Sequence, residues 1–389
     1  MNAILEIEKK RSVDAGKRRP WWRLALEAAL LPCVAVAGLE LFFQAARTGE
    51  QEFLQPDLTY GNVHIPNKLV TWRMEGYSHD RLSPQGLRDL PRVTTKAPNV
   101  TRIALLGDSA TEGMQVPLEA TYGQALERRL NREAESAKIA KRFEVINFGC
   151  SGYSTGQQVL QYEQEVRKYH PDIVILMYNR GDNVENVFVP GPAGSIPPRP
   201  YFKLNDKNEI ETDNSIMEMN ADKLRPNQLL SFLRGNSRIF GVFSQQNLML
   251  SINEPMYHKL NQIISKFQLS NSPVARNRFV KPSYPLQDPW VVTTKLLDRL
   301  RGDVKDDGAQ FVLLLFPNSI QDKTYAAQEQ AFETDSKARG YNLLALTPIF
   351  KAMPDMHKLY LQYHFSVTGH SVVAHMVHNY LLQQFDLLR

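Results

Sequence analysis

The sequence predicts an α/β protein in three layers, with a doubly wound, mainly parallel sheet of five strands between two sets of helices. From residue 101 onward, short apolar runs rich in Val, Ile, Leu and Phe alternate with helical patterns. Apolar runs without polar alternation are typical of parallel strands covered on both faces, and strand–helix alternation predicts helices on both sides of the sheet. The predicted strands are RIALLG (102–107), FEVIN (143–147), IVILMY (173–178), FVLLLF (311–316) and NLLAL (342–346).

Five helical segments accompany these strands, and one interval interrupts the rhythm. The predicted helices span about 119–135, 155–169, 288–307, 322–338 and 367–386. The interval from about 188 to 286 opens with VPGPAGSIPPRP, whose prolines cannot continue a helix. Within it, YFKLNDKNEIET (201–212) predicts a small hairpin. We therefore expect one domain, 101–389, with an insertion over the ligand-binding edge of its sheet.

The chain before this domain divides into three parts. Residues 1–23 form a basic tail, residues 24–45 contain the apolar run LALEAALLPCVAVAGLELFF, and residues 46–100 form an irregular lead-in. The apolar run is just long enough to cross a hydrocarbon core of about 30 Å, and the basic residues before it predict a cytoplasmic N-terminus. A single-pass transmembrane signal-anchor is therefore expected. The alternatives are a signal peptide cleaved at AVAG (35–38) and a soluble amphipathic helix.

Charge and cysteine content exclude several classes of protein. The net charge is +5, but seven basic residues against three acidic ones place +4 of it in residues 1–23. The folded body therefore lacks the basic stripe of a nucleic-acid binder. Cys33 lies in the predicted span and Cys150 at the end of a predicted buried strand. The pair offers no disulfide framework and no Cys-x-x-Cys site, and we expect no metal centre.

Candidate site residues come directly after the predicted strands or before the last helix, where open α/β sheets carry their reactive groups. A serine in a strand-to-helix turn can be exposed beside backbone N–H groups that face an oxyanion, although a helix cap explains it equally well. A lone histidine is by itself more often structural than catalytic. The candidates are Ser109 in LLGDSATEG (105–113), Gly149 and Gly152 in NFGCSGYST (147–155), Asn179, Asn183 and Asn186 in NRGDNVEN (179–186), and His364 in HFSVTGH (364–370).

In this order the motifs resemble those of the SGNH (GDSL-type) hydrolase superfamily, from about residue 101 to 386 less the insertion. HPDIVIL before the third motif and QVPLEATYGQALERRL after the first extend the likeness, and HDRLSPQGLRDL (79–90) resembles the segment before this domain in membrane-anchored bacterial members. The resemblance implies Ser109 as nucleophile and His364 as general base. It also implies the N–H groups of Ser109 and Gly152 as oxyanion donors, with no metal or organic cofactor.

The sequence departs from the family pattern at two positions. The family's third motif supplies an asparagine amide to the oxyanion hole, and a gapless match places Gly181 there. Asn183, or alternatively Asn179, is the expected substitute. The family's acid precedes the histidine by two or three residues, where this chain has Gln362. The Gln362 amide oxygen could orient His364, and Asp355 is an upstream alternative.

Two functions are compatible with these residues. The first is a serine esterase or acyl-ester transferase acting through an acyl-serine on an acylated, especially acetylated, polysaccharide or lipid. The second is a catalytically weakened SGNH domain that serves as a glycan-binding or assembly subunit of an envelope acyltransferase system. In both, the chain is expected in the bacterial inner membrane with its domain in the periplasm, beside envelope polysaccharide-modification proteins and away from nucleic acid.

Overall fold

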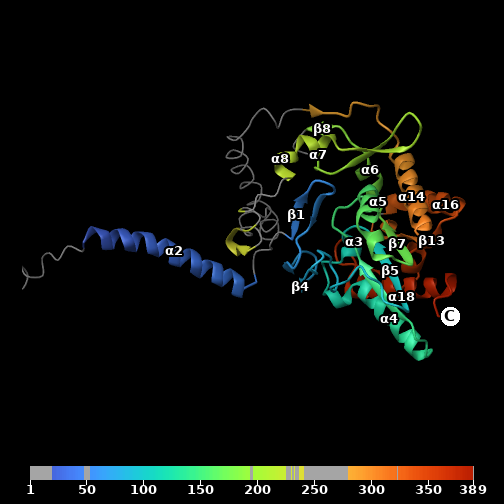
Figure 1. Cartoon of the computed structure of the whole chain (residues 1–389), viewed down its shortest axis with the longest axis horizontal. Helices are drawn as coiled ribbons and strands as arrows, with labels where there is room; N and C mark the ends of the chain where they lie inside the picture. The colour runs from blue at the N-terminus through green and yellow to red at the C-terminus, as the bar shows by residue number, and fades with distance from the viewer. Residues whose placement is uncertain are drawn as a thin grey trace, which may run out of the picture.

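The computed structural model describes residues 20–47, 53–192, 196–224, 229, 232, 236–240, 279–321 and 323–388. Its centre is the predicted five-stranded parallel sheet, with strand order β13–β12–β7–β5–β6 (Figure 1). The strands are β5 (Val100–Leu106), β6 (Arg142–Asn147), β7 (Ile173–Tyr178), β12 (Gln310–Leu315) and β13 (Asn342–Ala345). The chain runs from β5 to β6 at one edge and then returns to β7 on the other side of β5. The carboxyl ends of β5 and β7 therefore flank the point where an open α/β sheet binds ligands.

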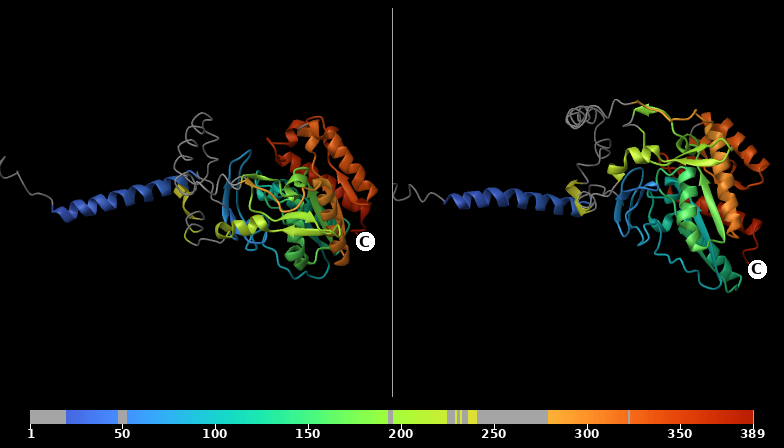
Figure 2. Two further views of the ribbon diagram at one scale, coloured as in Figure 1. Left: turned by 90° about the horizontal axis from the view of Figure 1, so that it is seen from above. Right: turned by 45° about the horizontal axis from the view of Figure 1, so that its top comes forward.

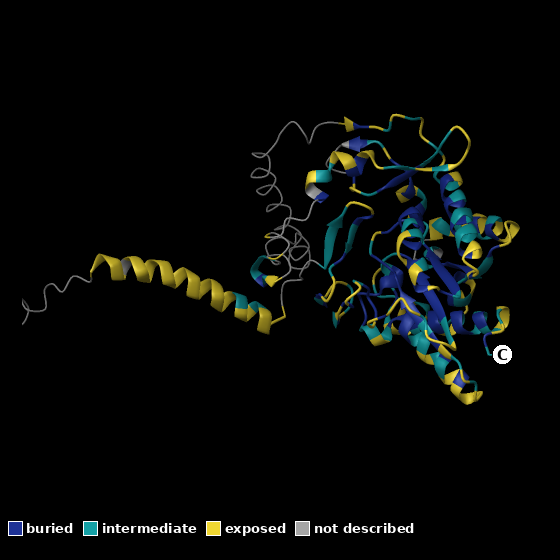
Figure 3. Ribbon diagram, viewed as in Figure 1, coloured by how far each residue is buried: buried dark blue, intermediate teal, exposed yellow. Residues whose placement is uncertain are grey.

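Helices cover both faces of the sheet, as predicted. α5 (Thr155–Gln164) and α14 (Pro289–Asp306) pack on one face, and α4 (Tyr122–Ser136) and α18 (Val367–Gln384) on the other. Side chains alternate along β5: Leu106 points to the first core and Leu105 to the second. Figure 3 shows the strands buried between these layers. The cores fix the direction in which each strand delivers its last residue.

Three helices differ from their predicted bounds at the ends, where short 3₁₀ turns replace α-helix. η1 (Leu118–Ala120) precedes α4, η2 (Val166–Tyr169) follows α5, and η4 (Lys323–Tyr325) precedes α16 (Ala326–Ala338). Thr121 starts α4 because its side chain caps the N–H of Gln124. Such terminal turns are common and leave the layers unchanged.

The lead-in is more ordered than predicted and forms two β-hairpins. β1 (Leu54–Asp57) pairs with β2 (Gly61–His64), and β3 (Leu69–Trp72) pairs with β4 (Ser78–Arg81). Strands of four residues carry too little alternation to be recognised from sequence. Figure 2 shows both hairpins against the α/β domain, on its side toward α2.

Buried hydrogen bonds hold the second hairpin on the segment that follows α3 (Ser109–Glu112). The Ser78 hydroxyl donates to the Met114 carbonyl at 2.6 Å. The Arg88 guanidinium donates to the Asp80 carboxylate and to the Val116 carbonyl, each at 2.9 Å. Because Ser78 and Arg88 are buried, the tip of the hairpin has a fixed position relative to the start of α3.

The insertion contains the predicted hairpin. β9 (Tyr201–Leu204) pairs with β10 (Ile210–Asp213), and β8 (Gly191–Pro192) pairs with β11 (Phe279–Val280). Two short helices follow, α7 (Ser215–Met219) and α8 (Ala221–Leu224). Phe202 joins the core on the α5 side of the sheet, so the insertion lies along that layer. Residues 241–278 of its predicted extent lie outside the described residues.

The predicted span corresponds to α2 (Trp21–Ala45), a helix of 25 residues. At about 1.5 Å per residue this length exceeds a hydrocarbon core of about 30 Å. Its apolar side chains are exposed (Figure 3). Within the described ranges α2 is the one helix that is long and apolar enough to cross a membrane, and a signal sequence would fit the same description.

Candidate active site

Ser109 is the first residue of α3, directly beyond β5. The Asp108 carboxylate caps this one-turn helix by accepting the Ala110 N–H at 2.9 Å. Gly113 ends the helix with a left-handed φ of 71°, which a residue without Cβ adopts at low cost. This turn chemistry places the Ser109 hydroxyl at the edge of the sheet, as predicted.

His364 lies in the tight turn before α18. The Leu361 N–H donates to the His364 carbonyl at 2.8 Å, and Tyr360 forms a bridge with Phe365. His364 Nε2 is 2.8 Å from Ser109 Oγ, across 255 residues of sequence. The structure therefore brings the two residues predicted as base and nucleophile into hydrogen-bonding contact.

An acidic residue that the sequence reasoning missed completes this contact. Glu75 lies at the tip of the hairpin between β3 and β4, and its Oε2 is 3.0 Å from His364 Nδ1. The same oxygen accepts the N–H groups of Tyr363 at 2.8 Å and His364 at 3.1 Å. The side chains of Glu75 and His364 are only 12% and 21% exposed. Glu75 thus occupies the place of a triad acid, from a different segment than the family pattern implies.

The Glu75 carboxyl is ionised at neutral pH. Partial burial raises its pKa, but the hydrogen bonds from Tyr363 and His364, together with the His364 charge, outweigh burial and bring the net pKa below 4.5. A carboxylate that accepts several N–H groups is stabilised in its charged form. It can therefore stabilise a protonated imidazole by charge as well as by hydrogen bonding.

The backbone at Glu75 is strained. Its φ is 61°, in the left-handed region that non-glycine residues adopt at a cost of about 1 kcal/mol or more. The next residue, Gly76, lies so close to the Gln115 carbonyl that a Cβ atom would come within 2.1 Å of it. The hairpin tip therefore packs closely against the chain after α3, and this contact fixes the position of the Glu75 carboxylate. Strain of this kind concentrates at functional sites.

The predictions for the orienting residue are corrected accordingly. Gln362 is exposed, and the Nδ1 atom it was expected to contact is hydrogen-bonded to Glu75. Asp355 pairs with Lys358 at 2.7 Å, and both side chains are more than half exposed. Glu75 could not have been found by motif, because it lies 289 residues before His364 and its only signal is an acidic residue beside Gly76 between two short strand-like runs.

Gly152, the predicted second oxyanion donor, lies in the loop after β6. Its φ is 76°, and a Cβ atom there would meet nothing within 4 Å, so a ligand can reach this part of the backbone. Asn147 ties the loop to α3 by donating to the Thr111 carbonyl at 2.9 Å. The Cys150 N–H donates to the Gly107 carbonyl at 3.2 Å. These bonds keep the Gly152 loop beside the turn that carries Ser109.

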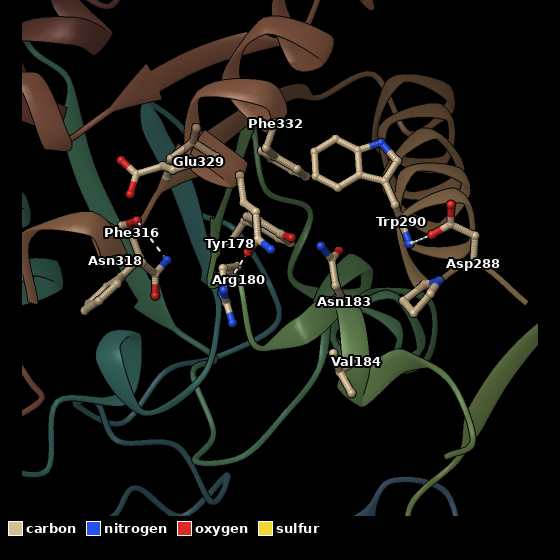
Figure 4. A pocket seen from close by; sticks show the side chains of 13 residues that line it. Tyr178, Arg180, Asn183, Val184, Asp288, Trp290, Phe316, Asn318, Glu329 and Phe332 are labelled. Carbon is tan, nitrogen blue, oxygen red and sulfur yellow. Dashed lines mark hydrogen bonds between the residues drawn. The ribbon is translucent and has the colours of Figure 1, made fainter. Parts of the chain in front are cut away.

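The prediction of Asn183 as third oxyanion donor is not supported by its position. Its side chain lines a pocket with Tyr178 and Trp290 (Figure 4), because it follows Gly181 by half a turn of α6 (Asp182–Asn186). The alternative, Asn179, lies nearer the nucleophile and donates to the Asp108 carboxylate at 3.0 Å. Asn179 therefore supports the turn that carries Ser109, with one of its two amide N–H groups bonded to Asp108. Asn186 is buried and donates to Thr293 at 2.8 Å, which makes it structural.

One group of described residues has metal-ligand chemistry. Ligand atoms of His64, Glu112 and Cys150 lie within 4.8 Å of one another in the interior. However, His64 Nε2 already contacts the Glu112 carboxylate at 2.5 Å, and Ser151 donates to its other oxygen. Burial, followed by the Glu112 charge, raises the pKa of the Cys150 thiol well above its usual value, which disfavours the thiolate. We interpret the group as a polar clamp between the first hairpin and the Gly152 loop.

A cleft of about 440 Å³ opens beside Gly152, between the lead-in and the insertion. Tyr60, Asn62 and Gln157 form one side of it, and Pro198 and Arg199 form the other. The position agrees with the expectation that the insertion covers the ligand-binding edge of the sheet. A ligand bound there would reach the Gly152 loop from the side of α5.

The chain is similar in fold to several solved hydrolases, although no family profile and no curated protein sequence matches it. The lipase/acylhydrolase from Enterococcus faecalis is 11% identical, with 73% of this chain and 96% of that chain covered and a TM-score of 0.37. An acetylxylan esterase from Geobacillus stearothermophilus, solved as a catalytic mutant, is 11% identical, with coverages of 76% and 99% and a TM-score of 0.37. The lipase Lip_vut3 from a goat rumen metagenome is 12% identical, with coverages of 72% and 97% and a TM-score of 0.37.

Proposed function

We propose that this protein is a serine esterase or acyl-ester transferase that works through an acyl-serine intermediate. The observation that carries the proposal is the continuous contact from Glu75 through His364 to Ser109, at 3.0 and 2.8 Å. A hydroxyl bonded to a base that is itself oriented by a third group is the general arrangement of an activated nucleophile. With Glu75 in place, the constellation lacks neither base nor acid.

The reaction proceeds in two halves. Ser109 Oγ attacks the ester carbonyl carbon and passes its proton to His364 Nε2, while the Glu75 carboxylate stabilises the imidazolium at Nδ1. The N–H groups of Ser109 and Gly152 bind the developing oxyanion. His364 then returns the proton to the leaving alcohol as the carbon–oxygen bond breaks, which leaves the acyl group on Ser109. Water or an acceptor hydroxyl then attacks the acyl carbon and gives its proton to His364. His364 returns this proton to Ser109 Oγ as the acyl–Oγ bond breaks, which releases the acyl group and restores the serine hydroxyl.

The substrate is proposed to be an acetyl or other acyl ester on a polysaccharide or lipid at the extracytoplasmic face of a bacterial inner membrane. The apolar helix α2 after a basic tail supports membrane attachment in that orientation. The cleft beside Gly152 is open and partly polar in its lining, which suits a large acyl-bearing glycan. One of the similar structures is named as an acetylxylan esterase, that is, an enzyme for an acetylated polysaccharide. Envelope polysaccharide-modification proteins are the proposed partners.

The proposal is tested by covalent labelling of the full-length protein in detergent with a fluorophosphonate. We expect labelling of the unaltered protein and of Ser371→Ala, whose hydroxyl on α18 contacts Arg129, and no labelling of Ser109→Ala. Turnover of p-nitrophenyl acetate should follow the same order. A folded protein that neither labels nor turns over this ester would refute the enzymatic proposal.

A second candidate function follows from the oxyanion hole. Gly181 has no side chain to donate, and within the described residues Asn179 and Asn183 direct their amides elsewhere. Loss of one oxyanion donor typically lowers kcat about 10²–10³-fold. A domain weakened in this way would act as a glycan-binding or assembly subunit beside an acyltransferase. Binding of glycan without labelling of Ser109 is the result that would favour it.

A further inference from the structure

A second cavity lies at the carboxyl ends of β7 and β12, and we call it the aromatic pocket. Its core is formed by Tyr178, Asn183, Trp290 and Phe332 (Figure 4). Its volume is about 270 Å³, near the lower end of the range of roughly 300–1,000 Å³ for small-molecule sites. The pocket therefore suits one small ring and is too small for a long chain.

The aromatic pocket adjoins the catalytic residues on two sides. Tyr178 and Arg180, both in its wall, flank Asn179, which donates to the Asp108 carboxylate at 3.0 Å. On the other side, the Phe316 ring packs against Phe365, the neighbour of His364, with 4.9 Å between ring centroids. A ligand in the pocket would therefore lie next to both the turn that carries Ser109 and the turn that carries His364.

Aromatic rings form a rigid wall of the pocket. The Tyr178 ring is stacked on Phe332 with 4.0 Å between centroids, and Trp290 meets Phe332 edge-on at 5.2 Å. Arg180 crosses the Tyr325 ring at 3.4 Å and donates to Gln328 at 2.5 Å, so its side chain is held at the rim. These contacts keep the pocket open rather than allowing the side chains to close it.

Two buried polar atoms of the pocket have no partner among the described residues. They are the Tyr178 hydroxyl, on a residue only 4% exposed, and Asn183 Oδ1. Figure 4 shows the Asn183 amide directed between Tyr178 and Trp290. Burial raises the pKa of Tyr178 well above its usual value, so the hydroxyl remains a neutral donor. Buried polar groups are nearly always hydrogen-bonded, which indicates that a polar ligand satisfies these atoms.

We propose that the aromatic pocket binds one sugar ring of the substrate, next to the acyl ester presented to Ser109. The placement of the ester at Ser109 rests on the proposed function, whereas sugar binding in the aromatic pocket does not. A pyranose has C–H faces that pack on aromatic rings and hydroxyls that both donate and accept, so it complements Trp290, the Tyr178 hydroxyl and Asn183 together. A fatty acyl chain would leave the two polar atoms buried and unpaired. At the rim of the pocket, Arg180 is paired with the neutral amide of Gln328. These polar groups also favour a ligand with hydroxyls over a hydrocarbon chain.

The test is a binding measurement on full-length Ser109→Ala in phosphatidylcholine nanodiscs, which avoid sugar-based detergents. Saturation-transfer NMR would measure the affinity for methyl glycosides of glucose, galactose, mannose, xylose and N-acetylglucosamine, and for sodium octanoate. We expect at least one glycoside to bind, and Tyr178→Phe and Asn183→Leu each to weaken it about tenfold, the worth of one hydrogen bond. Tyr178→Phe should not lower the thermal midpoint of the free protein, because the hydroxyl it removes has no partner.

Tyr162→Phe is the matched control. Tyr162 belongs to the same core as Tyr178, but its hydroxyl donates to Asp307 at 2.7 Å. Removal of this hydroxyl should therefore lower the thermal midpoint and leave the affinity for sugar unchanged. Binding of octanoate without any glycoside would identify an acyl-chain pocket and overturn the proposal. So would the absence of all binding, or sugar binding that the two pocket variants do not weaken. If the glycoside binds but the unaltered protein is not labelled by the fluorophosphonate, the esterase proposal is refuted and the sugar-pocket proposal is retained.

Discussion

Replacing Glu75 by glutamine removes one charge from the active site and keeps the size of the side chain. The variant retains an oxygen that can accept the N–H groups of Tyr363 and His364, so the hairpin tip should stay in place. What it loses is the attraction between a carboxylate and the imidazolium that forms during attack by Ser109. The variant therefore isolates the electrostatic contribution of Glu75 to the transition state.

The expected size of the effect follows from the contact geometry. Glu75 Oε2 and His364 Nδ1 are 3.0 Å apart, which places the delocalised charges about 4 Å apart. At an effective dielectric constant of about 20 their attraction is about 4 kcal/mol, or about 10³-fold in rate. Neutralising the acid of a serine-protease triad costs about 10⁴-fold. We therefore expect kcat to fall by about 10³–10⁴-fold, with little change in KM.

The assay is hydrolysis of p-nitrophenyl acetate by purified full-length protein, with folding checked by circular dichroism. Asp355→Asn is the matched control, because Asp355 is the acidic residue nearest before His364 and pairs with exposed Lys358. It should retain full activity. The assignment of Glu75 fails if Glu75→Gln retains more than about a tenth of kcat, or if Asp355→Asn is equally impaired.

Three further results are expected. Gln362→Asp should not raise kcat, since Nδ1 of His364 is already bonded to Glu75; a large gain would mean that Glu75 is not the working acid. Arg88→Met should lower the free energy of unfolding in urea by about 3 kcal/mol, because it leaves the Asp80 carboxylate and the Val116 carbonyl without their buried partner; a loss below about 0.5 kcal/mol would contradict the hairpin anchor. Burial, followed by the charges of His364 and Arg88, lowers the pKa of His370 from 6.5 to about 3. The unfolded chain therefore binds more protons than the folded one between these values, so stability should fall by about 1.4 kcal/mol per pH unit below 6.5, and His370→Asn should remove this slope.

Local sequence was sufficient for the central sheet with its helices and for two of the residues proposed to react. The five strands were recognised because continuous apolar runs in parallel strands are a local signal, and the helices because of their 3.6-residue period. Ser109 and His364 were recognised because Gly-Asp-Ser and His-x-x-x-x-Gly-His sit at turns whose chemistry is also local. Both predicted residues meet in the structure at 2.8 Å. By contrast, the four-residue strands of the lead-in carried no usable period.

The tertiary structure decided which acid serves His364 and where the asparagines point. Glu75 reaches Nδ1 only because buried bonds such as Ser78 to Met114 fasten its hairpin beside α3, and no periodicity or spacing encodes a contact between segments 289 residues apart. Asn183 points into the aromatic pocket because α6 begins one residue after Gly181, a register that sequence reasoning locates only to within a few residues. The sequence by itself thus determined the sheet and located the two residues that we propose as nucleophile and base. The packing of the lead-in hairpin on the domain placed Glu75 beside His364, because a contact between distant segments exists only once both have folded.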